Sequence, residues 1–97
     1  MKYLMVDASL NGTGIRDYYD GLYINPEDLH LSANTKKQIA EWLLRYTTEH
    51  YKGYRNADVI EELDCEGHEI ALTVKRELID VKIGYYSEAK MTQELPQ

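Results

Sequence analysis

The chain is poor in cysteine, and it lacks any long apolar run. Its single cysteine, Cys65, has no partner for an internal disulfide, and one cysteine excludes metal sites built from several. The N-terminal stretch MKYLMVDASLNG holds too few consecutive apolar side chains for a signal-peptide core or a membrane span. We therefore expect a cytoplasmic protein that does not associate with membranes.

Basic side chains are also scarce. Lysine and arginine number 11 against 17 aspartates and glutamates, which gives a formal net charge of −6. Binding to nucleic acid depends on basic side chains that displace counterions from phosphates, so we expect no direct nucleic-acid partner. A basic protein partner fits the charge better, because opposite potentials steer association.

The apolar pattern predicts a single domain of the α+β class. A chain of 97 residues can bury only one modest core. The run KYLMV predicts a strand at 2–6, and the alternating stretch DVKIGYYS predicts another at 80–87. Apolar residues at helical spacing predict helices at about 33–52 and 57–78. We expect two layers, in which this helix pair packs on a small two- or three-stranded antiparallel sheet.

The helix starts and the irregular segments follow from local chemistry. Asn25 and Ser32 can each cap a helix, the first of these helices short and begun by Pro26, and either Asn56 or Asp58 can open a third. Residues 8–25 are rich in turn formers, which predicts at most a short helical turn around IRDYY, although GLYI at 21–24 could add a third strand. Gly67 lies on the apolar stripe of the last helix, which favours close helix packing. The segment from about 89 has no apolar periodicity and is expected to fray.

The stretch DASLNGTGIRD follows the first strand, where many nucleotide-binding folds hold a phosphate. Gly12 and Gly14 match the first two glycines of a dinucleotide turn, but Asp17 stands where the third belongs and would repel a phosphate. No P-loop lysine follows. We favour a tight connection whose glycines permit positive φ, and we keep a small-ligand or nucleotide-binding protein using residues 7–17 as the alternative function.

Other candidate sites are weaker still. Asp7, Asp17 and Asp20 could approach a divalent cation, but their spacing matches no calcium loop. Cys65 and His68 lie three residues apart on one predicted helix, but two ligands do not make a metal site. We therefore expect a buried thiol beside a surface histidine. No acid, base and nucleophile converge in the sequence. We expect no enzymatic activity, no cofactor and no metal.

The acidic residues are concentrated in one window. Residues 56–70 contain six carboxylates and no lysine or arginine. A solvated outer helix face would explain this pattern, and so would a docking surface for a cationic partner. The candidate binding residues are Asp58, Glu61, Glu62, Asp64, Glu66 and Glu69.

Tyrosine replaces phenylalanine throughout, with nine tyrosines and no phenylalanine. The adjacent pairs at 18–19 and 85–86 must each send at least one ring outward from any strand or helix. Exposed tyrosine is a preferred contact residue at protein interfaces. We therefore add Tyr18, Tyr19 and Tyr86 to the candidate binding residues.

Five segments together resemble small bacterial immunity proteins of the contact-dependent growth inhibition type: LMVDASLNGTGIRD, INPEDLHLS, WLLRYTTEHYKGY, LDCEGHEIA and ELIDVKIGYYSEAKM. The resemblance covers nearly the full chain as a pattern of helix and strand landmarks. It implies a cytosolic inhibitor that binds the toxic C-terminal domain of a cognate effector, often a nuclease, and blocks its active site or substrate path. The family has no shared set of contact residues to carry over.

The charge pattern agrees with that resemblance. A nuclease carries basic side chains for its phosphate substrate, and an acidic, tyrosine-bearing surface can occupy them. We expect a monomer or a weak homodimer. A structural or regulatory adaptor that dimerises through its tyrosines is a third interpretation.

Overall fold

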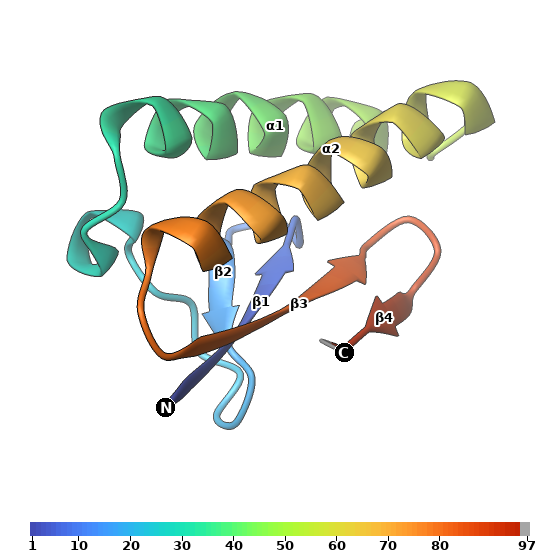
Figure 1. The fold of residues 1–97 in the computed structure, drawn as a ribbon. Coiled ribbons are helices and arrows are strands. Elements are labelled where there is room, and N and C mark those ends of the chain that lie inside the picture. The colour runs from blue at the N-terminus through green and yellow to red at the C-terminus, as the bar shows by residue number, and fades with distance from the viewer. Residues whose placement is uncertain (96–97) are drawn as a thin grey trace.

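A computed structural model describes residues 1–95, which fold into two layers. Two antiparallel helices lie side by side on one face of a four-stranded sheet (Figure 1). The elements in chain order are β1 (Lys2–Asp7), β2 (Gly14–Asp17), a 3-10 helix η1 (Pro26–Leu29), α1 (Ala33–Tyr51), α2 (Ala57–Glu77), β3 (Val81–Ser87) and β4 (Thr92–Glu94). The predicted two-layer α+β architecture is confirmed.

The sheet has the strand order β2-β1-β3-β4 and is mixed. The expected antiparallel pairing of the first and last predicted strands is wrong, because β1 and β3 run parallel, with Leu4 opposite Ile83. The reason is β2, which pairs antiparallel with β1 and returns the chain to the end where β1 began. The helix pair starts and finishes at that same end (Figure 1), so β3 leaves in the direction of β1.

Two short strands were not predicted. Residues 14–17 form β2 where a helical turn around IRDYY was expected. Residues 92–94 form β4, which pairs antiparallel with β3, so the expectation of a frayed tail is wrong for these residues. Residues 96–97, also assigned to that tail, lie outside the described residues. The segment 21–24 contributes only an isolated bridge between Arg16 and Tyr23.

The helix starts follow the predicted caps. The side chain of Ser32 accepts a hydrogen bond from the Thr35 amide, and that of Asn56 accepts one from the Val59 amide. Asn25 caps η1 in the same way. Each cap satisfies an amide that has no partner within its own helix.

The core lies between the helices and the sheet. Its fully buried members come from both layers and include Leu4, Val6, Ile15, Ile39, Trp42, Tyr46, Leu63, Ile70 and Val74. The Trp42 indole donates to the backbone carbonyl of Leu63 at 2.8 Å, which joins α1 to α2. Burial of these side chains holds the helix pair against the sheet.

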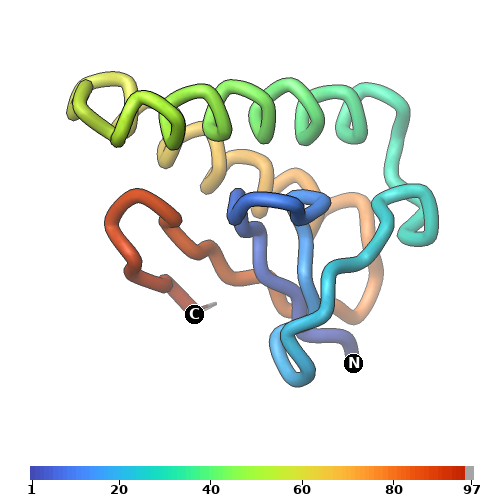
Figure 2. The backbone as a smooth tube through the Cα atoms, turned by 180° about the vertical axis from the view of Figure 1, so that it is seen from behind, coloured from blue at the N-terminus to red at the C-terminus, as the bar shows by residue number. Residues whose placement is uncertain are grey.

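The other face of the sheet is covered by no helix or strand among residues 1–95 (Figure 2). Strand alternation directs Tyr3, Asp7, Arg16 and Tyr86 to this open face, while Leu4 and Val6 point to the helices. Neither of the two long helices in the described part of the chain is apolar enough to cross a membrane.

Candidate functional site

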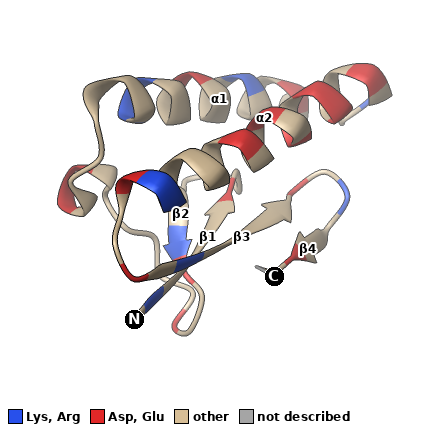
Figure 3. Ribbon diagram, viewed as in Figure 1, with Lys and Arg blue, Asp and Glu red and all other residues tan. Residues whose placement is uncertain are grey.

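The outer surface of α2 carries most of the predicted acidic residues. The apolar stripe of α2 is buried against the sheet and α1, and Asp and Glu positions recur along the length of the helix (Figure 3). Asp58, Glu61, Glu62 and Glu69 are exposed, and Glu66 is half-buried. We call these five residues the acidic face.

The acidic face is only partly neutralised. Glu66 pairs with Arg45 of α1 at 3.1 Å, and Glu61 pairs with Lys90 of the β3–β4 turn. Among residues 1–95, Glu62 and Glu69 form no ion pair. A shallow hollow between the helices is lined by Arg45, Glu61, Glu62, Cys65, Glu66 and Glu69, which brings four carboxylates and one guanidinium together. The surface is therefore suited to cationic groups.

Asp64 does not belong to that surface, and its assignment to an exposed binding face is wrong. The residue is only 6% exposed and lies on the buried side of α2. Its carboxylate accepts hydrogen bonds from Tyr46 (2.9 Å), Tyr85 (2.5 Å) and Ser87 (2.8 Å). Burial, followed by the bond to Asp64, raises the pKa of the Tyr85 hydroxyl far above its usual value, so this group stays a donor. Asp64 joins α1, α2 and β3 in the interior.

The candidate tyrosines lie on the opposite side of the molecule from the acidic face. Tyr85 points into the core and Tyr86 to the open face, so one ring of the pair points outward as predicted. The Arg16 guanidinium lies 5.8 Å from the centre of the Tyr86 ring. Tyr18 is half-buried, and Tyr19 is 73% exposed.

The structure thus divides the predicted binding residues into two sets. The acidic face lies on α2, and the tyrosines lie on and beside the far side of the sheet. Because the sheet and the helix layer separate the two sets, they form two surfaces. Sequence reasoning treated them as one.

The 7–17 connection is filled by its own side chains. Asp7 is buried, pairs with Arg16 at 2.6 Å and accepts hydrogen bonds from the amide and hydroxyl of Ser9. Gly14 has a φ of +95°, as the interpretation of a tight turn requires, and it opens a strand. A phosphate loop places its anion at a helix N-terminus, and here β2 stands in that position.

Cys65 and His68 are separate in role. Cys65 is exposed, so the expectation of a buried thiol is wrong. The His68 ring contacts the Asp64 carbonyl through Nδ1 at 2.8 Å and the Glu94 carboxylate through Nε2 at 2.6 Å, which ties α2 to β4. In the described part of the chain, no group of three or more His, Cys, Asp or Glu side chains is arranged to hold a metal ion.

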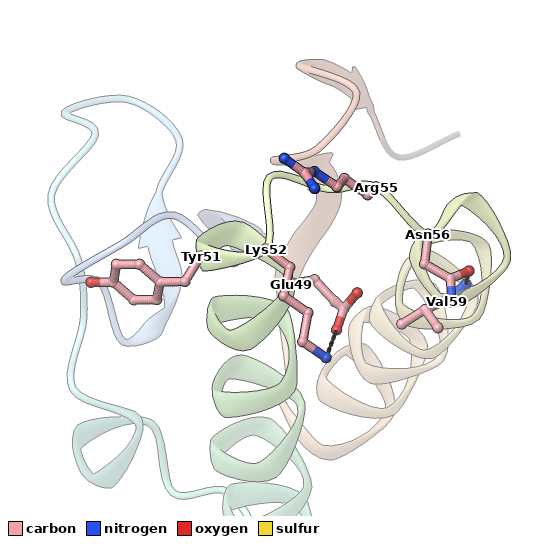
Figure 4. A pocket seen from close by; sticks show the side chains of 6 residues that line it. All are labelled: Glu49, Tyr51, Lys52, Arg55, Asn56 and Val59. Carbon is pink, nitrogen blue, oxygen red and sulfur yellow. Dashed lines mark hydrogen bonds and ion pairs between the residues drawn. The ribbon is translucent and has the colours of Figure 1, made fainter.

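A hollow at the turn between α1 and α2 was not predicted (Figure 4). It is lined by Glu49, Tyr51, Lys52, Arg55, Asn56 and Val59. Lys52 pairs with Glu49 at 3.5 Å across one helical turn, which leaves Arg55 as the second cation of the lining. This mixture of one carboxylate and two cations, open to solvent, has no arrangement of acid, base and nucleophile.

No protein-family model, curated protein or solved structure matched this chain. The functional argument therefore depends on the two surfaces. One is a helix face rich in carboxylates, and the other is an aromatic surface beside the sheet face that no helix covers.

Proposed function

We propose that this protein is an immunity protein, a cytoplasmic inhibitor that binds a cognate bacterial toxin domain and neutralises it. The observation that carries the proposal is the acidic face of α2, where five carboxylates are met by only two basic partners, Arg45 and Lys90. An exposed carboxylate surface of this kind attracts a basic protein surface and speeds encounter with it.

The partner that fits is a nuclease domain. Enzymes that cleave nucleic acid carry lysine and arginine along the path of the phosphate backbone. Carboxylates set along one helix face can pair with those cations and exclude the substrate. Inhibition of this kind needs no catalytic group on this chain.

The acidic face can bind without moving the core. Its side chains extend from a helix whose opposite side is fixed by Leu63, Ile70 and Val74, all fully buried. A rigid helix presents its charges in a defined pattern, which lowers the entropy lost on binding.

Charge reversal on α2 tests the proposal. Glu62 and Glu69 form no ion pair within the described chain, so Glu62→Lys/Glu69→Lys breaks none. The control is Asp28→Lys/Glu41→Lys, which makes the same change in net charge at exposed positions outside α2 and breaks one exposed ion pair, between Lys37 and Glu41 at 3.9 Å. Both variants should unfold at nearly the wild-type urea concentration, since exposed pairs contribute about 0–1 kcal/mol.

The readout is protection of cells that express the cognate toxin domain, for which the gene next to this one is the first to test. Wild-type protein and the control variant should restore growth and inhibit the purified toxin. The α2 variant should protect less and require a higher concentration for inhibition. Equal protection by all three folded proteins would remove the acidic face from the interface, and failure of the wild type to inhibit would refute the immunity function itself.

A further inference from the structure

His68 joins α2 to β4 through both nitrogens of its ring. Nδ1 lies 2.8 Å from the backbone carbonyl oxygen of Asp64, one helical turn earlier, and Nε2 lies 2.6 Å from a carboxylate oxygen of Glu94. A carbonyl oxygen has no proton to donate, and neither has an ionised carboxylate. Both ring nitrogens must therefore be donors for the two contacts to be hydrogen bonds.

A neutral histidine cannot make both of these bonds. Its ring carries one proton, so one nitrogen donates and the other presents a lone pair. In neutral His68, either the Asp64 contact or the Glu94 contact would set two lone pairs against each other at hydrogen-bond distance. The bridge from α2 to β4 thus contains one proton more than a neutral histidine and a carboxylate supply.

The buried Tyr85 ring restricts how His68 can move. The two ring centres lie 4.5 Å apart. Tyr85 is 3% exposed and donates to the Asp64 carboxylate, so it cannot move aside. The Asp64 carbonyl is part of the α2 backbone and is equally fixed. His68 is therefore held between a fixed acceptor on α2 and the Glu94 carboxylate on β4.

Charged and titratable groups of α2, β3, β4 and the β3–β4 turn line the hollows beside the His68 ring. Carboxylates outnumber ammonium groups among them, so the ring lies in a surface of net negative charge. The groups are Glu61, Asp64, Cys65 and Lys75 of α2, Tyr85 of β3, Lys90 of the turn and Glu94 of β4.

Strand β4 has few other attachments (Figure 1). It pairs with β3 over Thr92–Glu94 only, and all of its residues are exposed. The turn before it is fastened by the ion pair of Lys90 with Glu61 and by the Ala89 amide, which donates to the Tyr46 hydroxyl at 3.1 Å. Among residues 1–95, the Glu94–His68 contact is the one side-chain hydrogen bond from β4 itself to the helices.

We propose that His68 is a proton-dependent fastener of β4. The imidazolium bridges the Asp64 carbonyl and the Glu94 carboxylate, and loss of its second proton loosens β4 from α2. Histidine exchanges that proton between about pH 5 and about pH 8. The bridge is therefore complete on the acidic side of this range and is lost as the pH rises through it. This inference does not depend on the acidic face or on the identity of a toxin.

NMR of the full chain tests the bridge directly, at about pH 5.5 and about pH 8.5, on either side of the range in which histidine titrates. Long-range proton–nitrogen correlation reports which ring nitrogens carry protons. Both nitrogens of His68 should carry one at the lower pH, and only one nitrogen at the higher pH. After correction for the intrinsic exchange rate, the most protected amide of β4 should lose about two- to fivefold in hydrogen-exchange protection at the higher pH, the effect of one exposed ion pair.

Variants separate the bridge from a general effect of pH. His68→Gln keeps a donor that does not titrate, and Glu94→Gln supplies an amide that can donate to a neutral ring. In both variants β4 should be equally protected at the two pH values. His30→Asn is the control, because it removes an exposed histidine outside α2 and β4, and asparagine tolerates the positive φ of 58° at this position. It should keep the pH dependence of the wild type.

The proposal is overturned by any of three results: a ring nitrogen of His68 without a proton at the lower pH, equal protection of β4 at both pH values in the wild type, or the wild-type pH dependence in His68→Gln. Circular dichroism and urea unfolding of each variant establish that the fold is intact. Because no toxin is used, failure here leaves the charge-reversal test of the immunity function unaffected.

Discussion

Replacing Gly67 with alanine should destabilise the protein, although alanine is the better helix former. Gly67 lies on the buried side of α2, where an added Cβ would lie 2.6 Å from Tyr85 Cζ and 2.8 Å from its hydroxyl oxygen. Close packing of the helices was predicted at Gly67. The structure instead packs Gly67 closely against the Tyr85 ring of β3. The ring has little freedom to move, because it is 3% exposed, donates to Asp64 and lies 4.5 Å from the His68 ring.

The magnitude follows from opposing effects. Alanine gains about 1 kcal/mol of helix propensity over glycine. Overpacking costs about 1–3 kcal/mol, and displacing the Tyr85 hydroxyl from a charged acceptor costs about 1.5–3 kcal/mol. The free energy of unfolding should therefore fall by about 1.5–5 kcal/mol, measured in urea titrations followed by circular dichroism.

A second background makes the reasoning refutable. The three Tyr85 atoms that crowd the added Cβ lie beyond Cδ, and leucine has no atoms beyond Cδ. In a Tyr85→Leu background, Gly67→Ala should therefore change sign and stabilise by up to about 1 kcal/mol. A neutral or stabilising effect in the wild type, or the same loss in both backgrounds, would contradict the packing argument.

Two further predictions concern the helix ends and the thiol. Hydrogen bonds from the Ser32 amide and the Thr35 hydroxyl lower the pKa of Glu77 below its ordinary value of 4.5. The Glu77 carboxylate therefore contributes its full stabilisation above pH 4.5, and this contribution is lost as the pH falls through the lower pKa of the folded state. Glu77→Gln should thus show a smaller loss of stability than the wild type between about pH 6 and about pH 3 in urea melts, and an equal loss would refute this. Cys65 should react with a chromogenic disulfide reagent without denaturant, because its side chain is exposed; reaction only after unfolding would show it to be buried.

Local chemistry predicted the helices and their starts well. Asn25, Ser32 and Asn56 cap helices where expected, because a cap depends on a few neighbouring residues. The direction of β3 could not be derived in this way. It depends on β2, a strand of four residues that is too short to show a long alternating pattern. Strand β4 escaped prediction for the same reason, since it is shorter still.

The candidate surfaces were predicted less completely than the fold. Asp64 stands four residues after Ile60 and three before Gly67, so helical spacing already placed it on the buried stripe. The concentration of charge in residues 56–70 obscured that position. The packing of Tyr3 against Tyr18 depends on the β1–β2 pairing, and sequence reasoning missed that pairing along with β2.

The central claim is that the acidic face steers a basic toxin domain onto this protein. Its most direct test is the association rate of Glu62→Lys/Glu69→Lys with that domain, measured by stopped flow at low salt and at 1 M salt. We expect association about tenfold slower than for wild type and for Asp28→Lys/Glu41→Lys at low salt, with the difference nearly gone where the screening length is about 3 Å. Equal rates for the three proteins at low salt would contradict the claim.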